Sequence, residues 1–171
     1  MPNHLPKLFH ALADAGIEHA EFELSDPEDS DSNIQAWLGA LPKDGSRVVT
    51  FAQDGTGSLF GVWLRAGHAD LETAPIIYLG SEGETAVLGK DPRAFIELLG
   101  SAMTFDGHAG TFFSTDDEDD DDVRERRERT ASFAKRALGI AALREPGEIK
   151  AEAEAAYPDL SAWVDANNAH R

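Results

Sequence analysis

The segment from Arg47 to Leu99 places the strongest constraint on the fold, because four strand-like runs in it are followed by one helical run. The strand-like runs are rich in β-branched and aromatic residues, and the turns between paired runs contain glycine, which accepts positive φ angles. The expected strands are residues 47–53, 58–65, 75–79 and 85–88, with turns at 54–57 and 81–84. Strands that give way to a helix within one compact unit indicate an α+β fold.

The helical run begins with a strong start signal. Asp91 is a good N-cap residue, and Pro92 suits the first helical position because its missing N–H has no partner there in any helix. Phe95, Leu98 and Leu99 recur at spacings that place them on one side of a helix. The sequence therefore predicts a helix with one buried stripe directly after the fourth strand.

Four short sequences in this segment carry a family resemblance: FAQDGTG (51–57), WL (63–64), PIIYLGSEGE (75–84) and FIELL (95–99). Together they resemble the core of the SUKH superfamily, which includes fungal cell-wall-synthesis regulators and many bacterial immunity proteins. The resemblance implies a SUKH-like fold with a central, antiparallel-rich sheet of about four to six strands flanked by helices. It also implies a binding function, usually the neutralisation of a toxin by physical contact.

A chain of 171 residues favours one domain and is long enough to bury a sizeable core. We expect a single SUKH-like domain over residues 1–171. Its parts are a core at 33–101, an acidic loop at 114–122 and a helical C-terminal extension at 123–171. The extension has few apolar positions and would be marginal alone, so it is not expected to fold independently.

Apolar periodicity and turn residues predict the elements outside the central segment. Helices are expected at 4–15, 33–41, 123–138 and 147–156, with a short terminal helix around Leu160, Trp163 and Val164. Gly16 is expected to end the first helix, because glycine adopts the left-handed conformation of a helix terminus. An edge strand is expected within 17–24, a solvated loop at 25–32 and a connecting segment at 100–113.

The chain is strongly acidic. It has 15 Lys and Arg against 32 Asp and Glu, which gives a net charge of −17 with histidine neutral. Such a surface repels nucleic acid and anionic membranes and attracts basic partners over about a Debye length. Two alternatives stay open, because acidity can also maintain solubility or reflect a host whose proteins are generally acidic.

Cysteine is absent, which excludes disulfides, thiolate nucleophiles and cysteine-ligated metal sites. No apolar run approaches the roughly 20 residues of a membrane-spanning helix. The first residues lack the charged start, long apolar stretch and small-residue cleavage site of a signal peptide. We therefore expect a soluble, cytoplasmic protein.

Motifs for chemistry are few. The chain has no Gly-x-Ser-x-Gly elbow and no phosphate-binding loop, and Gly55-x-Gly57 lacks the third glycine of a dinucleotide fingerprint. The six histidines are dispersed, without the spacing of a metal-ligand pair. The chain is therefore expected not to be an enzyme and to have no catalytic residue, cofactor or bound metal.

Residues 116–122 form a block of like charges, which repels itself and is expected to be a disordered loop. Asp117, Asp119, Asp121 and Glu128 match positions one, three, five and twelve of a calcium-binding EF-hand loop. However, Asp122 occupies the position of the required glycine, and the second half of the loop is basic. The pattern therefore disfavours calcium and favours a solvated acidic loop.

Turn acids and exposed aromatic residues are the candidates for partner contacts. Glu82 and Glu84 are either exposed turn acids or part of a partner-binding edge, since loops on a rigid sheet often carry recognition. Trp63 and Tyr78 are either core residues or the aromatic anchors that dominate interfaces. The predicted partner-binding residues are Asp54, Tyr78, Glu82, Glu84, Asp116, Asp117, Asp119, Asp120 and Asp121.

Three functional hypotheses follow. The first is a non-enzymatic immunity protein that binds a basic toxin domain, such as a bacterial nuclease, and occludes its active site. The alternative is a regulatory or scaffold adaptor of the same fold that binds an endogenous protein. The third, an enzyme acting on a cationic substrate, has the least support. In the first two, the partner is a protein rather than nucleic acid or a membrane, and the chain itself is a monomer or a weak dimer.

Overall fold

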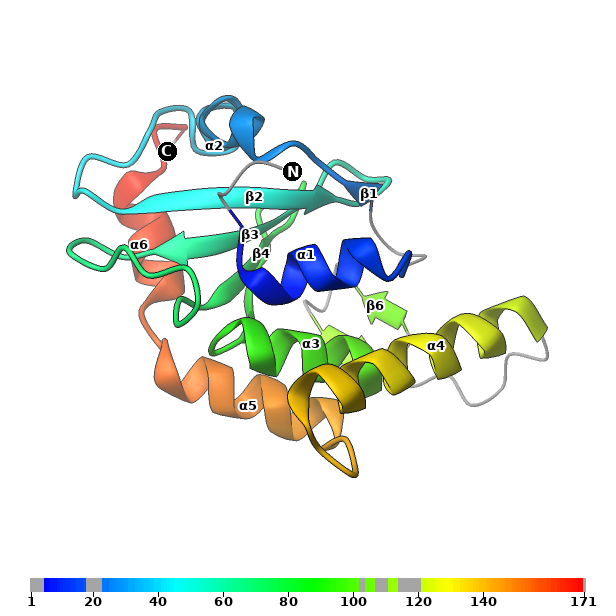
Figure 1. The fold of residues 1–171 in the computed structure, drawn as a ribbon. Coiled ribbons are helices and arrows are strands. Elements are labelled where there is room, and N and C mark those ends of the chain that lie inside the picture. The colour runs from blue at the N-terminus through cyan, green and yellow to red at the C-terminus, as the bar shows by residue number, and fades with distance from the viewer. Residues whose placement is uncertain (1–4, 18–22, 102–103, 107–110, 114–120, 171) are drawn as a thin grey trace.

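The computed structural model describes residues 5–17, 23–101, 104–106, 111–113 and 121–170, which form an α+β fold around one antiparallel sheet (Figure 1). Each strand pairs with its neighbour in the chain, and helices cover both faces. The strands of this sheet are β1 (Glu23–Leu24), β2 (Arg47–Gln53), β3 (Leu59–Leu64), β4 (Ile76–Leu79) and β5 (Thr85–Gly89). The predicted α+β class and the four central strands are confirmed. β1 lies within the predicted edge strand at 17–24, of which residues 18–22 are outside the described residues.

The β2–β3 hairpin follows from its turn chemistry. The Asp54 carboxylate accepts hydrogen bonds from the Thr56 N–H (2.9 Å) and the Ser58 N–H (3.0 Å). Gly57 has a φ of +91°, a conformation that side chains other than glycine rarely adopt. The side chain of Asp54 thus closes the turn in the manner of an Asx turn, and the register Gln53–Leu59 follows from it.

Helix α3 (Pro92–Ser101) begins where the sequence predicts. The Asp91 carboxylate accepts a hydrogen bond from the Ala94 N–H at 2.8 Å, as an N-cap does. The expected single buried stripe is wrong, however, because nearly every residue from Ala94 to Gly100 is buried. Helix α4 (Asp121–Leu138) packs closely against Gly100 of α3. If Gly100 had a Cβ atom, that atom would lie only 2.6 Å from the Cβ of Ala134 in α4.

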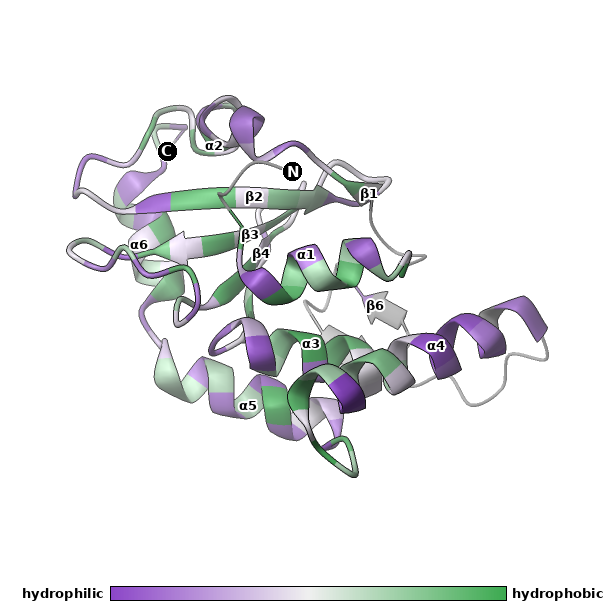
Figure 2. Cartoon of the chain, viewed as in Figure 1, coloured by the Kyte–Doolittle hydropathy of each residue, from purple (hydrophilic) through white to green (hydrophobic). Residues whose placement is uncertain are grey.

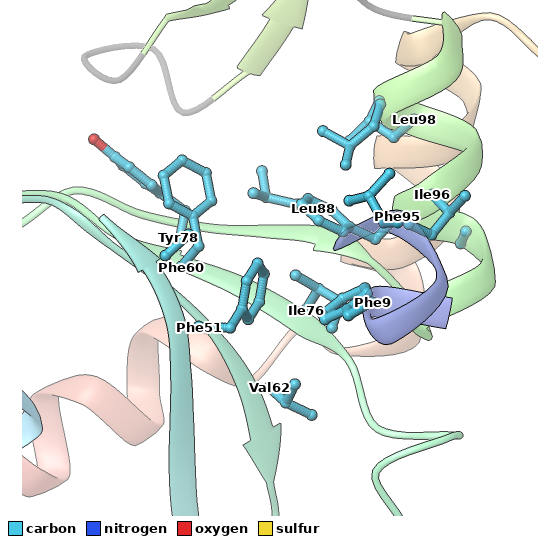
Figure 3. Packing of buried hydrophobic residues seen from close by; sticks show 14 of the residues in the cluster. Phe9, Phe51, Phe60, Val62, Ile76, Tyr78, Leu88, Phe95, Ile96 and Leu98 are labelled. Carbon is cyan, nitrogen blue, oxygen red and sulfur yellow. The ribbon is translucent and has the colours of Figure 1, made fainter. Parts of the chain in front are cut away.

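Side chains from the two faces of the sheet enter two separate cores. Along β2, Val49 and Phe51 face one core while Val48 faces the other, which is the two-residue period of a strand. The first core contains Phe9 from α1 (Lys7–Asp14) and Phe95 from α3, each packed against Phe51 (Figure 3). The sheet is therefore the middle layer of the molecule, and Figure 2 shows its hydrophobic strands between helices with polar outer faces.

Helix α1 lies within the predicted range and ends at Gly16, whose φ is +63°. The next predicted boundaries are wrong. The expected loop at 25–32 contains a 3₁₀ helix, η1 (Pro27–Asp29), and α2 (Ser30–Leu38) begins within it and ends before Leu41. Asp26 caps η1 through the Glu28 N–H, the Ser30 hydroxyl at the start of α2 accepts from the Thr50 N–H, and Gly39, with a φ of +79°, ends α2.

The predicted connecting segment at 100–113 is also wrong. It contains a second, two-stranded antiparallel sheet made of β6 (Thr104–Asp106) and β7 (Thr111–Phe113). Threonine and phenylalanine favour strands, and glycine in the residues between two such runs is a hairpin signal. The sequence has glycines at 107 and 110 between these runs, and both positions lie outside the described residues.

The three C-terminal helices are confirmed as predicted. They are α4 (Asp121–Leu138), α5 (Pro146–Ala156) and α6 (Leu160–Asn167). Helix α4 supplies Phe133 and Ala134 to the first core, while α6 supplies Trp163 and Val164 to the second. The C-terminal extension therefore completes both cores.

A charged network joins the C-terminal extension to α3. Arg144, just before α5, donates to the Glu97 carboxylate from Nη2 (2.7 Å) and Nε (3.0 Å), and from Nη1 to Glu152 (2.7 Å). Lys90 also donates to Glu152, at 2.6 Å. Hydrogen bonds from Arg144 lower the pKa of Glu97, which is only 8% exposed, and those from Lys90 and Arg144 lower the pKa of Glu152. The network holds α5 against α3 and the end of β5.

Candidate functional site

Three of the predicted partner-binding carboxylates converge at one end of the sheet. We call this region the hairpin end, and it consists of residues 54–58 and 80–84, the two turns that join β2 to β3 and β4 to β5. The Ser58 hydroxyl connects the turns, because its oxygen accepts a hydrogen bond from the Ser81 N–H at 3.1 Å. On the second turn, the Gly80 carbonyl accepts a hydrogen bond from Trp37 Nε1 at 2.8 Å. Both turns are thus held to each other and to α2.

The carboxylates at the hairpin end differ in what they do locally. Asp54 is partly buried, and its carboxylate closes the first turn. Glu84 is also partly buried, and its carboxylate lies against Gly80, where an added Cβ would be 2.3 Å from Oε2. Glu82 is exposed at the tip of the second turn. At the hairpin end, the carboxylate of Glu82 is therefore exposed, whereas those of Asp54 and Glu84 pack within the turns.

Tyr78 does not lie on this surface. Its side chain is 2% exposed, its hydroxyl donates to Ser58 at 2.9 Å, and its ring packs edge-on against Phe60 with centroids 5.4 Å apart. Burial raises the pKa of the Tyr78 hydroxyl, and the nearby carboxylates of Asp54 and Glu84 add to this effect. The prediction that Tyr78 is an exposed partner anchor is therefore wrong, because β4 turns this residue into the first core.

The acidic run is described only at its end. Asp116, Asp117, Asp119 and Asp120 lie outside the described residues, and so does most of the predicted acidic loop. Asp121 and Asp122 are not in a loop but in the first turn of α4, where the helix dipole favours carboxylates. Asp121 is highly exposed and forms an ion pair with Arg124.

The helical path of α4 also shows whether residues 117–128 can form an EF-hand loop. Positions five to twelve of that pattern, residues 121–128, run along a regular helix. A calcium loop must instead curl around the ion so that these positions face inward. An EF-hand site at 117–128 is therefore contradicted. In the rest of the described chain, no group of three or more metal-ligating side chains is arranged to hold an ion.

Sequence reasoning missed a cavity at the opposite end of the sheet. We call it the aromatic cavity; its volume is about 470 Å³, and residues at the end of β3 and in α6 contribute to its lining. Since β3 has six residues, the cavity is about 20 Å from the hairpin end. Its aromatic and charged walls are Trp63, Tyr157, Trp163, Asp44, Arg65 and Asp159.

The aromatic rings of this cavity already hold one cation. The Trp63 and Trp163 ring centroids lie 5.1 Å apart, and those of Trp63 and Tyr157 lie 6.4 Å apart. The Arg65 guanidinium carbon lies 5.4 Å from the Trp63 ring centroid and 5.9 Å from that of Tyr157. Both distances are within the range of cation–π attraction. The same guanidinium forms an ion pair with Asp159, at the start of α6.

Asp44 forms the other charged wall of the cavity. One carboxylate oxygen accepts hydrogen bonds from the Ser46 N–H (2.9 Å) and the Ser46 hydroxyl (2.5 Å), and the other accepts from Trp163 Nε1 (3.0 Å). Burial raises the pKa of Asp44, but these hydrogen bonds outweigh burial and lower it below the ordinary value. Asp44 is therefore a carboxylate at neutral pH, and within the described residues it has no cationic partner.

Comparison of the chain with protein-family models, curated proteins and solved structures finds no match. The SUKH resemblance therefore stays a prediction that depends on the residues quoted for it. In the described part of the chain, no helix combines the length and hydrophobicity needed to cross a bilayer.

Proposed function

We propose that this protein is a non-enzymatic binding module that neutralises a basic bacterial toxin domain by direct contact, as an immunity protein does. The observation that carries the proposal is the placement of Asp54, Glu82 and Glu84 on two mutually braced turns of a chain with a net charge of −17. Turns on a rigid scaffold are common sites of recognition. An excess of carboxylates accelerates the encounter with a basic partner.

The titratable groups with displaced pKa values also support binding over catalysis. Glu97, Glu152, Lys90 and Arg144 form one network that joins α3 to α5, and each owes its shift mainly to a partner in that network. Tyr78 is a buried core residue. Catalytic groups with shifted pKa values typically line a cleft. Among the described groups with a shift, only Asp44 does so, and hydrogen bonds from Ser46 and Trp163 account for its lowered pKa. These groups are explained by the stability of the fold.

Co-expression in bacteria tests the proposal. Each toxin-like protein encoded beside this chain in its source genome is expressed alone and together with the chain, and growth is measured. We expect growth to be restored for one of them. Glu82→Lys should weaken the rescue, because it reverses the most exposed charge at the hairpin end, while Glu148→Lys makes the same charge change on the distant α5 and should preserve it.

Two results would contradict the proposal. If the chain rescues none of these toxins and forms no complex with them in size-exclusion chromatography, neutralisation is wrong. If it instead forms a stable complex with a housekeeping protein of its host and has no effect on toxicity, the alternative of a regulatory or scaffold adaptor is favoured.

A further inference from the structure

The aromatic cavity has a composition that the stability of the fold does not require. Asp44 and Ser46 satisfy the indole N–H of the buried Trp163, but this N–H does not require the further carboxylate and the guanidinium that line the cavity beside three rings. Tryptophan, tyrosine and arginine are also the residue types that contribute most to protein–protein binding. The volume of about 470 Å³ falls within the range of 300–1,000 Å³ that is typical of ligand sites.

The charges in the cavity do not balance. Asp159 is paired with Arg65, whereas Asp44 receives hydrogen bonds only from the uncharged Ser46 and Trp163. The carboxylate of Asp44 is therefore left without a cationic partner among the described residues. A carboxylate accepts about four hydrogen bonds, and Asp44 accepts three, so one further donor can bind it.

The walls of the cavity also show which cation suits them. Arg65 stacks its guanidinium on Trp63 and Tyr157, so this chain already uses these ring faces to hold an arginine. Next to them, the Trp163 ring lies beside the unpaired charge of Asp44. An arginine from outside would meet an aromatic surface and a carboxylate together, the combination that favours a planar cation.

We propose that the aromatic cavity binds an arginine side chain of the partner protein, with Asp44 accepting from its guanidinium and Trp163 packing against it. This inference rests on the proposed function, because a basic partner supplies the arginine. It places this partner contact at the opposite end of the sheet from the predicted carboxylates.

The first test needs no knowledge of the partner. Acetyl-Gly-Arg-Gly-amide is titrated into the full chain, and the indole Nε1–H signals of Trp37, Trp63 and Trp163 are followed by NMR. The matched probe contains citrulline, which has nearly the same shape as arginine but no charge. We expect the arginine peptide to shift the Trp163 signal and to bind at least about tenfold more tightly than the citrulline peptide.

Variants separate the cavity from the general acidity of the chain. Asp44→Asn should weaken binding of the arginine peptide about tenfold, the effect of losing one charge-assisted hydrogen bond. Glu148→Gln removes one charge from exposed α5 and should leave binding unchanged. Because Asp44 also contacts Trp163, Tyr157→Leu serves as a second cavity variant and should weaken binding too. Circular dichroism confirms that each variant is folded.

Three results would overturn the inference: equal binding of the citrulline peptide, equal weakening by Asp44→Asn and Glu148→Gln, or no shift of the Trp163 signal. With a rescued toxin in hand, Asp44→Asn should also weaken the complex. If the toxin complex is unaffected by Asp44→Asn, the cavity inference fails while the proposed function stands. If the arginine peptide binds as expected but no toxin is neutralised, the proposed function fails while the arginine site remains.

Discussion

At the scale of single residues, Ser30 shows how one hydroxyl can hold the edge of a sheet. It is fully buried at the start of α2, and its oxygen accepts a hydrogen bond from the Thr50 N–H at 2.9 Å. Thr50 lies at the irregularity in the β2–β3 register, where the β2 backbone departs from regular pairing. The Ser30 hydroxyl therefore accepts the hydrogen bond that a carbonyl of a neighbouring strand would accept in a regular sheet.

Ser30→Ala tests this role. The substitution leaves the Thr50 N–H buried without a partner, so the free energy of unfolding should fall by about 1–3 kcal/mol. Urea unfolding followed by circular dichroism measures the change. Ser101→Ala is the control, because its hydroxyl donates to a carbonyl at the more accessible end of α3 and its loss should cost less than about 0.5 kcal/mol. Equal losses in the two variants would contradict the account.

At the scale of elements, α3 and α5 are joined by an ion-pair network in addition to the apolar core that Ile149 of α5 enters. Glu97 is the buried member of the network, while Arg144 remains 40% exposed, so solvent partly screens their attraction. Glu97 has a lowered pKa in the folded chain. Its contribution to stability is therefore fully present above its unfolded pKa of about 4.5 and is lost as the pH falls through the lower folded value.

Glu97→Gln should reduce the free energy of unfolding at pH 7 by about 1–2 kcal/mol, because Arg144 loses the more buried of its two charged partners. The difference between the original chain and the variant should shrink as the pH falls through the lowered pKa of Glu97 in the folded chain. Urea unfolding at several pH values measures this difference. Glu148→Gln should show no comparable change, and a Glu97→Gln difference that is constant with pH would contradict the assigned ion pair.

At the scale of the whole molecule, the C-terminal extension and the sheet form one packed unit. Trp163 and Val164 of α6 lie in the same core as Ile34 of α2 and Trp63 of β3. The Ala169 N–H continues this contact by donating to the Leu38 carbonyl at the end of α2. Elements that share a buried core tend to unfold together.

Amide hydrogen exchange tests this unity. The N–H groups of Trp163 and Val164 in α6 should be protected with nearly the same free energy of opening as those of Val62 and Trp63 in β3. The exposed first turns of α4 should exchange much faster, because they contribute little to either core. If α6 exchanges orders of magnitude faster than β3, the extension is a separate, weakly attached segment and the account is wrong.

Local signals predicted most of the framework. The β2–β3 and β4–β5 hairpins and the start of α3 depend on Asp54, Asp91 and nearby glycines, which act on residues within a few positions in the chain. The start of α2 was missed, because Ser30 is stabilised by Thr50, 20 residues away. The aromatic cavity was missed for the same reason, since Trp163 meets Asp44 across 119 residues. The contact between Trp163 and Asp44 exists only after the C-terminal helices have docked.

The candidate site was predicted only in part. Glu82 and Glu84 follow from turn chemistry, because charged residues in a tight turn rarely become buried. Tyr78 was misplaced, since a strand buried on both faces gives no alternation from which to infer an exposed side. Trp63, predicted as either a core residue or a partner anchor, and Trp163, predicted only as part of a terminal helix, gave no signal that the two would meet around a charged cavity.

The most direct test of binding without chemistry is a titration of the purified, active toxin with this protein. The account predicts that toxin activity falls linearly and reaches zero at a fixed stoichiometric ratio, and that toxin released from the complex regains its activity with unchanged mass. If substoichiometric amounts of this protein abolish the activity over time, or if the released toxin carries a covalent change, the protein is an enzyme and the account is contradicted.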